Sequence, residues 1–370
     1  MGHADGPCAE VAILGGGLAG WSLARALLEQ GLPPHQLILL EARVPGAGAS
    51  GVPWALLHPF PGRSLYPRPG YLAAWEYSLA WLEQLSAGGE QGLVRHLPLW
   101  RLAHEDETAL RFERSWQRAQ ALTGYPLQRL DPQLWPGAKG LYELGQGRLV
   151  ALPALLQRLR QLPISSRQSC GKVQLEPGPD AWTLSCQPGD VRARQVVLAC
   201  GSQLADYLPS LDLACSYGEV ASFRPDPDPE LQTAISAAGH FVAPLGQGLY
   251  HGGATHYAAT CSQPPLSAWR SLQQSLDWLP GIAKARLVSL WSGIRCGLRH
   301  DREPVVGSVV GHVPGLHHDN GPAAPGLWVM GAFSTRGLLL IPTAATALAR
   351  EILGTEAAIP VWMGTGRIKI

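Results

Sequence analysis

Three glycines near the N-terminus have the spacing of a dinucleotide-binding turn. In the segment VAILGGGLAG, four apolar residues precede Gly15, Gly17 and Gly20, and apolar residues at helical spacing follow. The first glycine permits a tight turn, the second lets a pyrophosphate approach the backbone, and the third lets the helix pack on the strand. The pyrophosphate would meet the first amides of that helix, at Leu18 and Ala19. A glycine-softened turn without a ligand is the alternative, but the strand before it and the helix after it favour the nucleotide site.

An acidic residue stands where a ribose would bind. The apolar run QLILLEA ends with Glu41 and Ala42, and a carboxylate about twenty residues beyond the glycines hydrogen-bonds the ribose hydroxyl in such folds. The pair Gly246 and Gly248 has no helical pattern after it, so we interpret it as part of a hairpin. We therefore expect one nucleotide site and no second site for a nicotinamide.

The elements that must position these residues follow two patterns. A loop rich in glycine and proline comes after Ala42, and the segment YLAAWEYSLAWLEQL then predicts an amphipathic helix. Later segments such as HFVAPL and LYHGGATHY are typical of antiparallel strands. We predict an α/β fold, α+β overall, in which a Rossmann-like domain is interleaved with an antiparallel β-sheet domain. The Rossmann-like domain is expected at residues 8–91, 148–210 and 285–356, the antiparallel domain at 92–147 and 211–284, and a C-terminal tail at 357–370.

Charge and hydropathy limit the partners of the protein. The 370 residues carry a formal net charge of +1, so no overall field attracts nucleic acid or an anionic membrane. Any RNA binding must use a local patch. The N-terminal segment MGHADGPCAE lacks a secretion pattern, and GLLLIPTAATALA is too short to cross a bilayer. We expect a soluble, cytoplasmic protein without membrane contact.

The cysteines give no sign of a disulfide framework or a zinc site. Their number is odd, and no pair has the C-x-x-C spacing. We expect thiols in a reducing compartment, and no metal. The seven residues are Cys8, Cys170, Cys186, Cys200, Cys215, Cys261 and Cys296.

Several segments together resemble a known enzyme superfamily. The glycine turn with Glu41, the loop GAGASGVPWALLHP and the C-terminal GAFSTRGLLLIP resemble the D-amino acid oxidase superfamily of FAD enzymes, which includes glycine oxidase and sarcosine oxidase. The segments VVLACGSQL, SGIRCGLRHDREPVVG and FSTRGLLLIPTAATALAREI are also similar to the FAD-dependent oxidase half of the MnmC family of tRNA-modifying enzymes, over about residues 10–360. The resemblance implies an FAD-binding Rossmann-like domain and a substrate domain.

The resemblance also assigns a cofactor role to particular residues, and it implies FAD that is bound non-covalently. Besides the glycine turn and Glu41, these residues are Ala49, Ser50 and Gly51 along the pyrophosphate and ribityl chain, Val173 at the adenine, Gly201 under the cofactor, and Gly331, Arg336, Gly337 and Leu338 around the flavin.

Two arginines are the catalytic residues that the resemblance implies. Arg295 lies in the GIR motif and Arg336 precedes GLLL, where related enzymes bring an arginine to the substrate carboxylate. A guanidinium can hold a carboxylate through two hydrogen bonds. The alternative is that these arginines only hold a domain interface together.

The implied reaction removes the carboxymethyl group of 5-carboxymethylaminomethyl-uridine at the tRNA wobble position, leaving 5-aminomethyl-uridine and glyoxylate. Methylation of that amine would be done by a separate methyltransferase, or not at all. Two alternatives remain open: a small-molecule oxidase acting on glycine, sarcosine or a D-amino acid, and a non-catalytic flavoprotein.

Other polar side chains stay open as substrate contacts. His58 follows the predicted flavin loop, and His251 and His256 lie beside Tyr250 and Tyr257 on predicted strands; we assign none of them as a general base.

Three arginines suggest a place for the tRNA. Arg111, Arg114 and Arg118 share one face of a charged helix. They are candidates for contact with tRNA phosphates, with a solvated helix face as the alternative.

Overall fold

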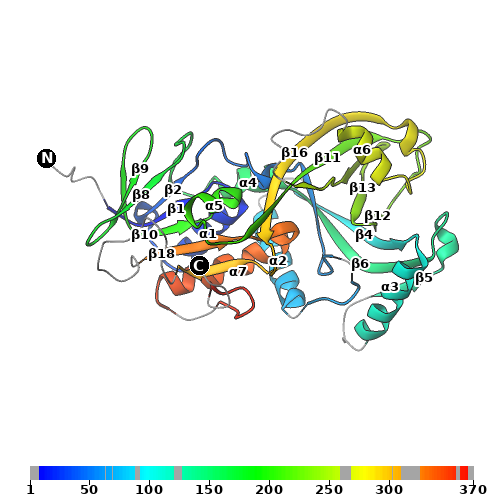
Figure 1. Ribbon diagram of the computed structural model, residues 1–370, viewed down its shortest axis with the longest axis horizontal. Coiled ribbons are helices and arrows are strands. Elements are labelled where there is room, and N and C mark those ends of the chain that lie inside the picture. The colour runs from blue at the N-terminus through cyan, green and yellow to red at the C-terminus, as the bar shows by residue number, and fades with distance from the viewer. Residues whose placement is uncertain are drawn as a thin grey trace. The chain divides into compact units, whose positions relative to one another are not determined.

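The computed structural model divides the chain into two compact units (Figure 1). Unit 1 comprises Met1–Gly51, Pro153–Cys215 and Ile294–Ile370, and unit 2 comprises Val52–Leu152 and Ser216–Gly293. The structure describes residues 8–62, 64–68, 70–87, 92–120, 127–258, 268–301, 303–309, 326–355 and 359–365.

The first crossover between the units differs from the expected position. The chain leaves unit 1 after Gly51 and not near residue 91, because β3 (Trp54–Leu57) pairs antiparallel with β6 (Gly140–Ala151) in unit 2. The amphipathic helix α2 (Tyr71–Ser86) follows β3 and also belongs to unit 2. The three later crossovers lie five, five and nine residues beyond the expected positions.

The expected C-terminal tail is partly integrated into unit 1. Strand β17 (Val305–Ser308) pairs with Gly364 through Val306, whose amide donates to the Met363 carbonyl at 2.9 Å. Met363 is fully buried.

Unit 1 is built on a mainly parallel sheet with the strand order β17-β18-β10-β1-β2-β7. Its central strands are continuous apolar runs, as expected for strands buried on both faces, and Val11 to Leu14 are at most 2% exposed. Only β17 pairs antiparallel along this order, and β8 and β9 form a hairpin beside β10. The strands are β1 (Cys8–Leu14), β2 (Leu37–Leu40), β7 (Ser165–Arg167), β8 (Gln174–Pro177), β9 (Trp182–Ser185), β10 (Val191–Leu198) and β18 (Leu327–Gly331).

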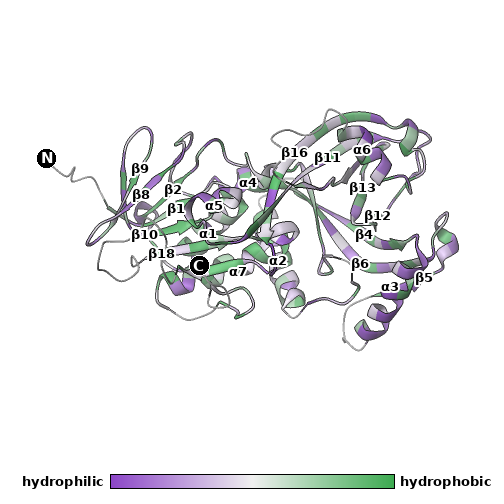
Figure 2. Ribbon diagram, viewed as in Figure 1, coloured by the Kyte–Doolittle hydropathy of each residue, from purple (hydrophilic) through white to green (hydrophobic). Residues whose placement is uncertain are grey.

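Helices cover this sheet. The first and last, α1 (Leu18–Glu29) and α7 (Gly337–Ile352), pack against each other. Both are rich in buried Leu and Ala, and α7 is coloured largely as hydrophobic in Figure 2. Shorter helices are α4 (Leu152–Leu159) and α5 (Leu204–Tyr207). No helix within the described ranges is long and apolar enough to cross a membrane.

Unit 2 is built on the second sheet, in the order β15-β11-β14-β13-β12-β4-β6-β3, with β16 beside β11 and β5 beside β6. Along the order from β15 to β3, and between β5 and β6, the pairings are antiparallel except that β12 runs parallel to β4. The two-sheet α/β fold class is therefore confirmed, as is the hairpin at Gly246 and Gly248, which joins β13 to β14. The strands are β4 (Val94–Ala103), β5 (Gln128–Leu130), β11 (Leu213–Arg224), β12 (Ala234–Ala237), β13 (His240–Gly246), β14 (Leu249–Gly253), β15 (Tyr257–Ala258) and β16 (Arg286–Leu298), and the other helices are α3 (Asp106–Ala119) and α6 (Ala268–Ser275).

Candidate cofactor and active site

The glycine turn closes tightly between β1, β10 and α1. Gly15 has φ +116°, and a Cβ added there would lie 2.4 Å from the Ala199 carbonyl oxygen. A Cβ on Gly20 would lie 1.9 Å from the Gly15 carbonyl oxygen. Only glycine fits at either position, so the spacing seen in the sequence is a packing requirement of this turn.

The N-terminus of α1 is prepared for an anion. Gly17 is the N-cap and has no side chain that could cap the helix, and the first turn contains no acidic residue. The first amides of a helix have no acceptor within the helix, so they can bind phosphate oxygens. Ser50, from the 3₁₀ turn Ala49–Gly51, accepts a hydrogen bond from the Leu18 amide at 2.9 Å. Its own hydroxyl proton remains available to a second acceptor.

Glu41 lies against the glycine turn. Its Oε2 accepts a hydrogen bond from the Gly16 amide at 2.7 Å, and its Oε1 accepts one from the Arg43 amide at 2.9 Å. The structure thus brings Glu41 to the turn. Gly16 was not identified from the sequence, although it stands between two of the predicted glycines. A Cβ on Gly16 would lie 3.1 Å from the Glu41 side chain.

The segment that leads to Val173 is hydrogen-bonded beside Glu41. The Cys170 amide donates to the Glu41 carbonyl and the Gly171 amide to the Ala42 carbonyl, both at 3.0 Å. Val173 is buried, and its carbonyl accepts a hydrogen bond from the Tyr207 hydroxyl at 2.9 Å. Burial raises the pKa of Tyr207 to about 12, which keeps this donor protonated. Tyr207 was not identified from the sequence, because it lies on α5 and meets Val173 only through a tertiary contact.

Two further glycines lie at the end of a strand of unit 1 or just beyond it. Gly201 follows β10 with φ +59° and begins a short 3₁₀ turn, Gly201–Gln203. Gly331 ends β18, where a Cβ would lie 2.2 Å from Leu204 Cδ1. Both positions lie at the carboxyl ends of strands, the edge at which open α/β sheets bind ligands.

The loop between β18 and α7 has a strained backbone. Ala332 and Ser334 adopt left-handed conformations, with φ +59° and +53°, at a cost of about 1–2 kcal/mol for a residue with a Cβ. Such strain is concentrated at functional sites. The helix α7 then begins at Gly337, and Leu338 is buried.

Arg336 is the N-cap residue of α7, and its guanidinium lies beside a carboxylate. It is 7% exposed, and its Nη1 lies 3.7 Å from Oε2 of Glu303, which is 13% exposed. The guanidinium charge is therefore balanced by a residue that the sequence did not single out.

Arg295 lies on β16, on the same strand face as Gly297. A Cβ on Gly297 would lie 3.1 Å from Ser334 Cβ, so this face of β16 packs against the loop that leads to Arg336. Burial lowers the pKa of the Arg295 guanidinium, which is partly buried. The segments carrying the two arginines therefore meet in unit 1.

The expectation that the cysteines form no disulfide is wrong for one pair. Cys215 and Cys296 are joined by a disulfide, although they are 81 residues apart in the chain. The reason is that β11 pairs with β16, a neighbourhood that cysteine spacing does not reveal. Four other cysteines are free thiols, and Cys261 lies outside the described residues. No group of three His, Cys, Asp or Glu that could hold a metal occurs among the residues the structure describes.

Two of the histidine candidates of unit 2, His58 and His251, are held neutral. His58 Nδ1 accepts a hydrogen bond from the Phe60 amide at 3.1 Å, and burial together with the charge of Arg101 lowers its pKa to about 3. His251 is 1% exposed, and burial lowers its pKa to about 4. Neither side chain changes protonation near neutral pH.

The other candidates lie on strands of unit 2. Tyr250 donates a hydrogen bond to Asp228 at 2.5 Å, Tyr257 pairs with Tyr217 through the backbone, and the His256 ring lies 6.1 Å from that of His240.

Arg101 was not identified from the sequence. It is 4% exposed and donates to the carbonyls of Phe60, Gly62 and Ser64 at 2.9, 2.9 and 3.2 Å. It therefore holds the loop that follows His58.

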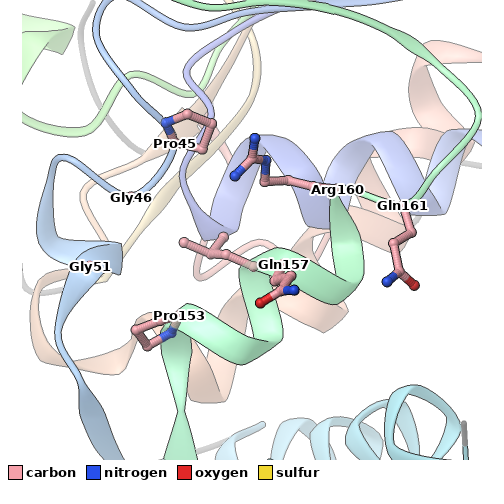
Figure 3. A pocket seen from close by; sticks show the side chains of 8 residues that line it. Pro45, Gly46, Gly51, Pro153, Gln157, Arg160 and Gln161 are labelled. Carbon is pink, nitrogen blue, oxygen red and sulfur yellow. The ribbon is translucent and has the colours of Figure 1, made fainter. Parts of the chain in front are cut away.

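A cavity of about 670 Å³ lies beside the loop that carries Ser50. Figure 3 shows Pro45 and Gly46 on one side of this cavity and Pro153 and Gln157 of α4 on another. None of the glycine-turn residues lines it.

The comparisons with known proteins agree on the family. The model of the family described as FAD dependent oxidoreductase matches residues 10–351. The protein named tRNA 5-methylaminomethyl-2-thiouridine biosynthesis bifunctional protein MnmC is 27% identical over 94% of this chain in Chromohalobacter salexigens and 28% identical over 99% in Maricaulis maris. These matches cover 54% and 55% of the two relatives, so the chain spans about half their length.

Solved structures share the fold. Glycine oxidase from Geobacillus kaustophilus matches with a TM-score of 0.80 at 22% identity, covering 95% of this chain and 96% of that one. Iminodiacetate oxidase from Chelativorans sp. BNC1 matches with a TM-score of 0.74 at 18% identity, covering 96% and 99%.

Proposed function

Because the chain belongs to the FAD dependent oxidoreductase family, whose model matches residues 10–351, we propose that it oxidises a secondary amine that carries a carboxymethyl group. The proposed substrate is 5-carboxymethylaminomethyl-uridine at the wobble position of tRNA, and the products are 5-aminomethyl-uridine and glyoxylate. The observation that carries the choice of substrate is the match to proteins named MnmC over 94% and 99% of this chain. In this proposal, methylation of the product amine belongs to a different catalytic centre.

The residues at the glycine turn fit FAD. Gly15 and Gly20 allow the tight turn, and Gly17 leaves room for a pyrophosphate, since a Cβ there would already lie 3.0 Å from Ser50 Oγ. The Leu18 amide already donates to Ser50, so the amides that follow it in the first turn of α1 and the Ser50 hydroxyl would donate to the phosphates. Glu41 would accept hydrogen bonds from the ribose hydroxyls.

The remaining cofactor contacts come from other segments of unit 1. Val173 has a backbone amide for the adenine, and the strained loop between Gly331 and Gly337 would border the flavin, together with Leu338. FAD, once bound, supplies an acceptor for the two electrons of amine oxidation. We propose that it is bound non-covalently.

Arg295 would hold the substrate carboxylate. Its partly buried guanidinium would bind the carboxylate through two hydrogen bonds and so fix the carbon that loses hydrogen. We assign Arg336 to the flavin border, because Glu303 already balances its charge at 3.7 Å. Orientation by Arg295 is then the main contribution of a side chain to catalysis.

The chemistry balances without a protein base. The carbon–nitrogen single bond of the neutral amine is oxidised to an imine, water adds to the imine carbon, and cleavage of the carbon–nitrogen bond releases glyoxylate and the primary amine. Dioxygen is the proposed final electron acceptor and is reduced to hydrogen peroxide. The low pKa values of His58 and His251, about 3 and about 4, make both side chains weak bases and support a mechanism in which neither carries a proton away.

Anaerobic bleaching of the flavin tests the function. The protein is mixed with tRNA that carries the carboxymethylaminomethyl group, with the same tRNA lacking it, and with glycine, sarcosine, iminodiacetate or D-alanine. We expect only the modified tRNA to bleach the flavin at low concentration, with release of glyoxylate. Bleaching by a free amino acid and not by the tRNA would identify a small-molecule amine oxidase, and bleaching by none of them would identify a non-catalytic flavoprotein.

A further inference from the structure

One face of helix α3 presents three exposed arginines. Arg111, Arg114 and Arg118 are three and four residues apart, so they form one stripe on the helix surface. All three are exposed, whereas Phe112 and Ala119 on the neighbouring face are buried. The stripe extends about 10 Å along the helix axis, and α3 is largely hydrophilic in Figure 2.

These arginines have no carboxylate partner within the described part of the chain. Arg111 donates to Thr108 Oγ1 at 3.1 Å and lies 6.0 Å from the Phe112 ring, and Arg118 lies 4.9 Å from the Tyr66 ring. Their positive charges therefore remain available, and two of the guanidiniums are positioned by aromatic rings.

Glu113, which stands between Arg111 and Arg114 in the sequence, is bonded to residues outside α3. Glu113 accepts a hydrogen bond from the Tyr142 hydroxyl at 2.8 Å and pairs with Arg129 at 3.7 Å. The stripe therefore has a local positive charge on a chain whose formal net charge is only +1.

The helix macrodipole accounts for one of the three arginines. Basic side chains favour the last turn of a helix because of the macrodipole, and that effect decays within one turn. Arg118 is the basic residue in the last turn of α3, and Asp106 and Glu107 are the acidic residues in its first turn. Arg111 and Arg114 lie between these ends, where the dipole gives no reason for them.

We propose that Arg111, Arg114 and Arg118 bind the phosphate backbone of the tRNA substrate. The inference rests on the proposed function, and it adds the surface of unit 2 that would recognise the RNA. Planar guanidiniums bind phosphate oxygens through paired hydrogen bonds. Contacts of this kind position a nucleic acid without reading its bases, so the surface would serve any tRNA that carries the modified uridine.

The test compares equilibrium binding of an unmodified tRNA transcript by two FAD-loaded proteins, the parent and R111Q/R114Q/R118Q, over a range of salt concentrations. Glutamine keeps the helix propensity close to that of arginine. Three lost phosphate contacts lower the slope of log affinity against log salt by about 2 to 3. Between about 50 mM and about 200 mM salt, the parent then loses about 20- to 40-fold more affinity than the variant.

A matched control removes three other exposed positive charges from unit 2, at Arg270, Lys284 and Arg286. We expect R270Q/K284Q/R286Q to keep the parental salt slope. Equal slopes for the parent and the α3 variant would overturn the inference. The three arginines would then be a solvated helix face or a contact for an acidic protein partner. This outcome is separate from the function itself, because failure of modified tRNA to bleach the parental flavin would overturn the proposed reaction whichever arginines bind RNA.

Discussion

Arg336 and Glu303 form a buried ion pair at the start of α7, with 3.7 Å between Nη1 and Oε2. The two side chains are 7% and 13% exposed. An ion pair that is shielded from water in this way responds strongly to the loss of one partner, because the remaining charge stays buried.

Replacing Glu303 by glutamine should therefore destabilise the protein by about 3–5 kcal/mol. Thermal or urea unfolding of the FAD-loaded protein measures this loss. The matched control is D212N, which breaks the exposed pair between Arg299 and Asp212, whose side chains are 58% and 54% exposed. An exposed pair contributes about 0–1 kcal/mol, so equal effects of the two variants would contradict the role given to Glu303.

Glycine at position 20 should be indispensable to the nucleotide turn. In G20A the new Cβ would lie 1.9 Å from the Gly15 carbonyl oxygen, and relief of that overlap must separate α1 from β1, at a cost of about 3 kcal/mol or more. In G48A the new Cβ meets nothing within 4 Å, so this variant should unfold like the parent. A stable G20A protein with full flavin content would show that the turn is looser than its geometry indicates.

The turn could be predicted because its glycine spacing belongs to one strand–turn–helix segment, with Glu41 at the end of the next strand. Of the steric contacts, only that of Gly20 with the Gly15 carbonyl lies within this segment, whereas Gly15 meets Ala199 and Gly17 meets Ser50. Gly16 fell outside that pattern because its amide bonds a side chain 25 residues away.

The partners of the arginines could not be predicted in the same way. Glu303 reaches Arg336 from a different segment of the chain, and Cys215 reaches Cys296 only because β11 pairs with β16. Strand order is set by the packing of whole elements. Composition and spacing within one segment do not determine it.

Glu41 should control affinity for the cofactor. Its two carboxylate oxygens accept hydrogen bonds from the Gly16 and Arg43 amides at 2.7 and 2.9 Å. In E41Q, one of these amides would face an NH₂ group, and the proposed ribose hydroxyls would lose a charged acceptor. A charged hydrogen bond contributes about 1.5–3 kcal/mol, so FAD should bind about 10- to 150-fold more weakly. Flavin fluorescence quenching measures this, with E10Q as a control at a carboxylate of the same unit that pairs with Arg194; E41Q with parental affinity would place the ribose elsewhere.

His251 should make the protein less stable in acid. Its pKa is lowered from 6.5 to about 4 in the folded state, so between these values the unfolded chain binds the proton more readily. Stability therefore rises with pH from about 4 to about 6.5 and is fully present above that range. The change amounts to about 3 kcal/mol.

Replacing His251 by glutamine should flatten the stability profile in this pH window, as measured by urea unfolding at a series of pH values. The control is H35Q, at an exposed histidine of unit 1, which should leave the profile as it is. A profile of H251Q parallel to that of the parent would assign the acid sensitivity to other groups.

Arg295 provides the decisive test of the proposed chemistry. A lysine at this position keeps the positive charge but loses the planar fork that binds a carboxylate through two hydrogen bonds. Because the proposed clamp orients the carbon that is oxidised, R295K should slow flavin reduction at saturating substrate, by about 10- to 150-fold for the loss of one charged hydrogen bond. Stopped-flow bleaching with the modified tRNA gives this rate. R299K, at an exposed arginine four residues further on, should reduce its flavin as fast as the parent. If R295K weakens substrate binding but keeps the parental rate at saturation, Arg295 binds the carboxylate without orienting the reacting carbon, and another residue must do so.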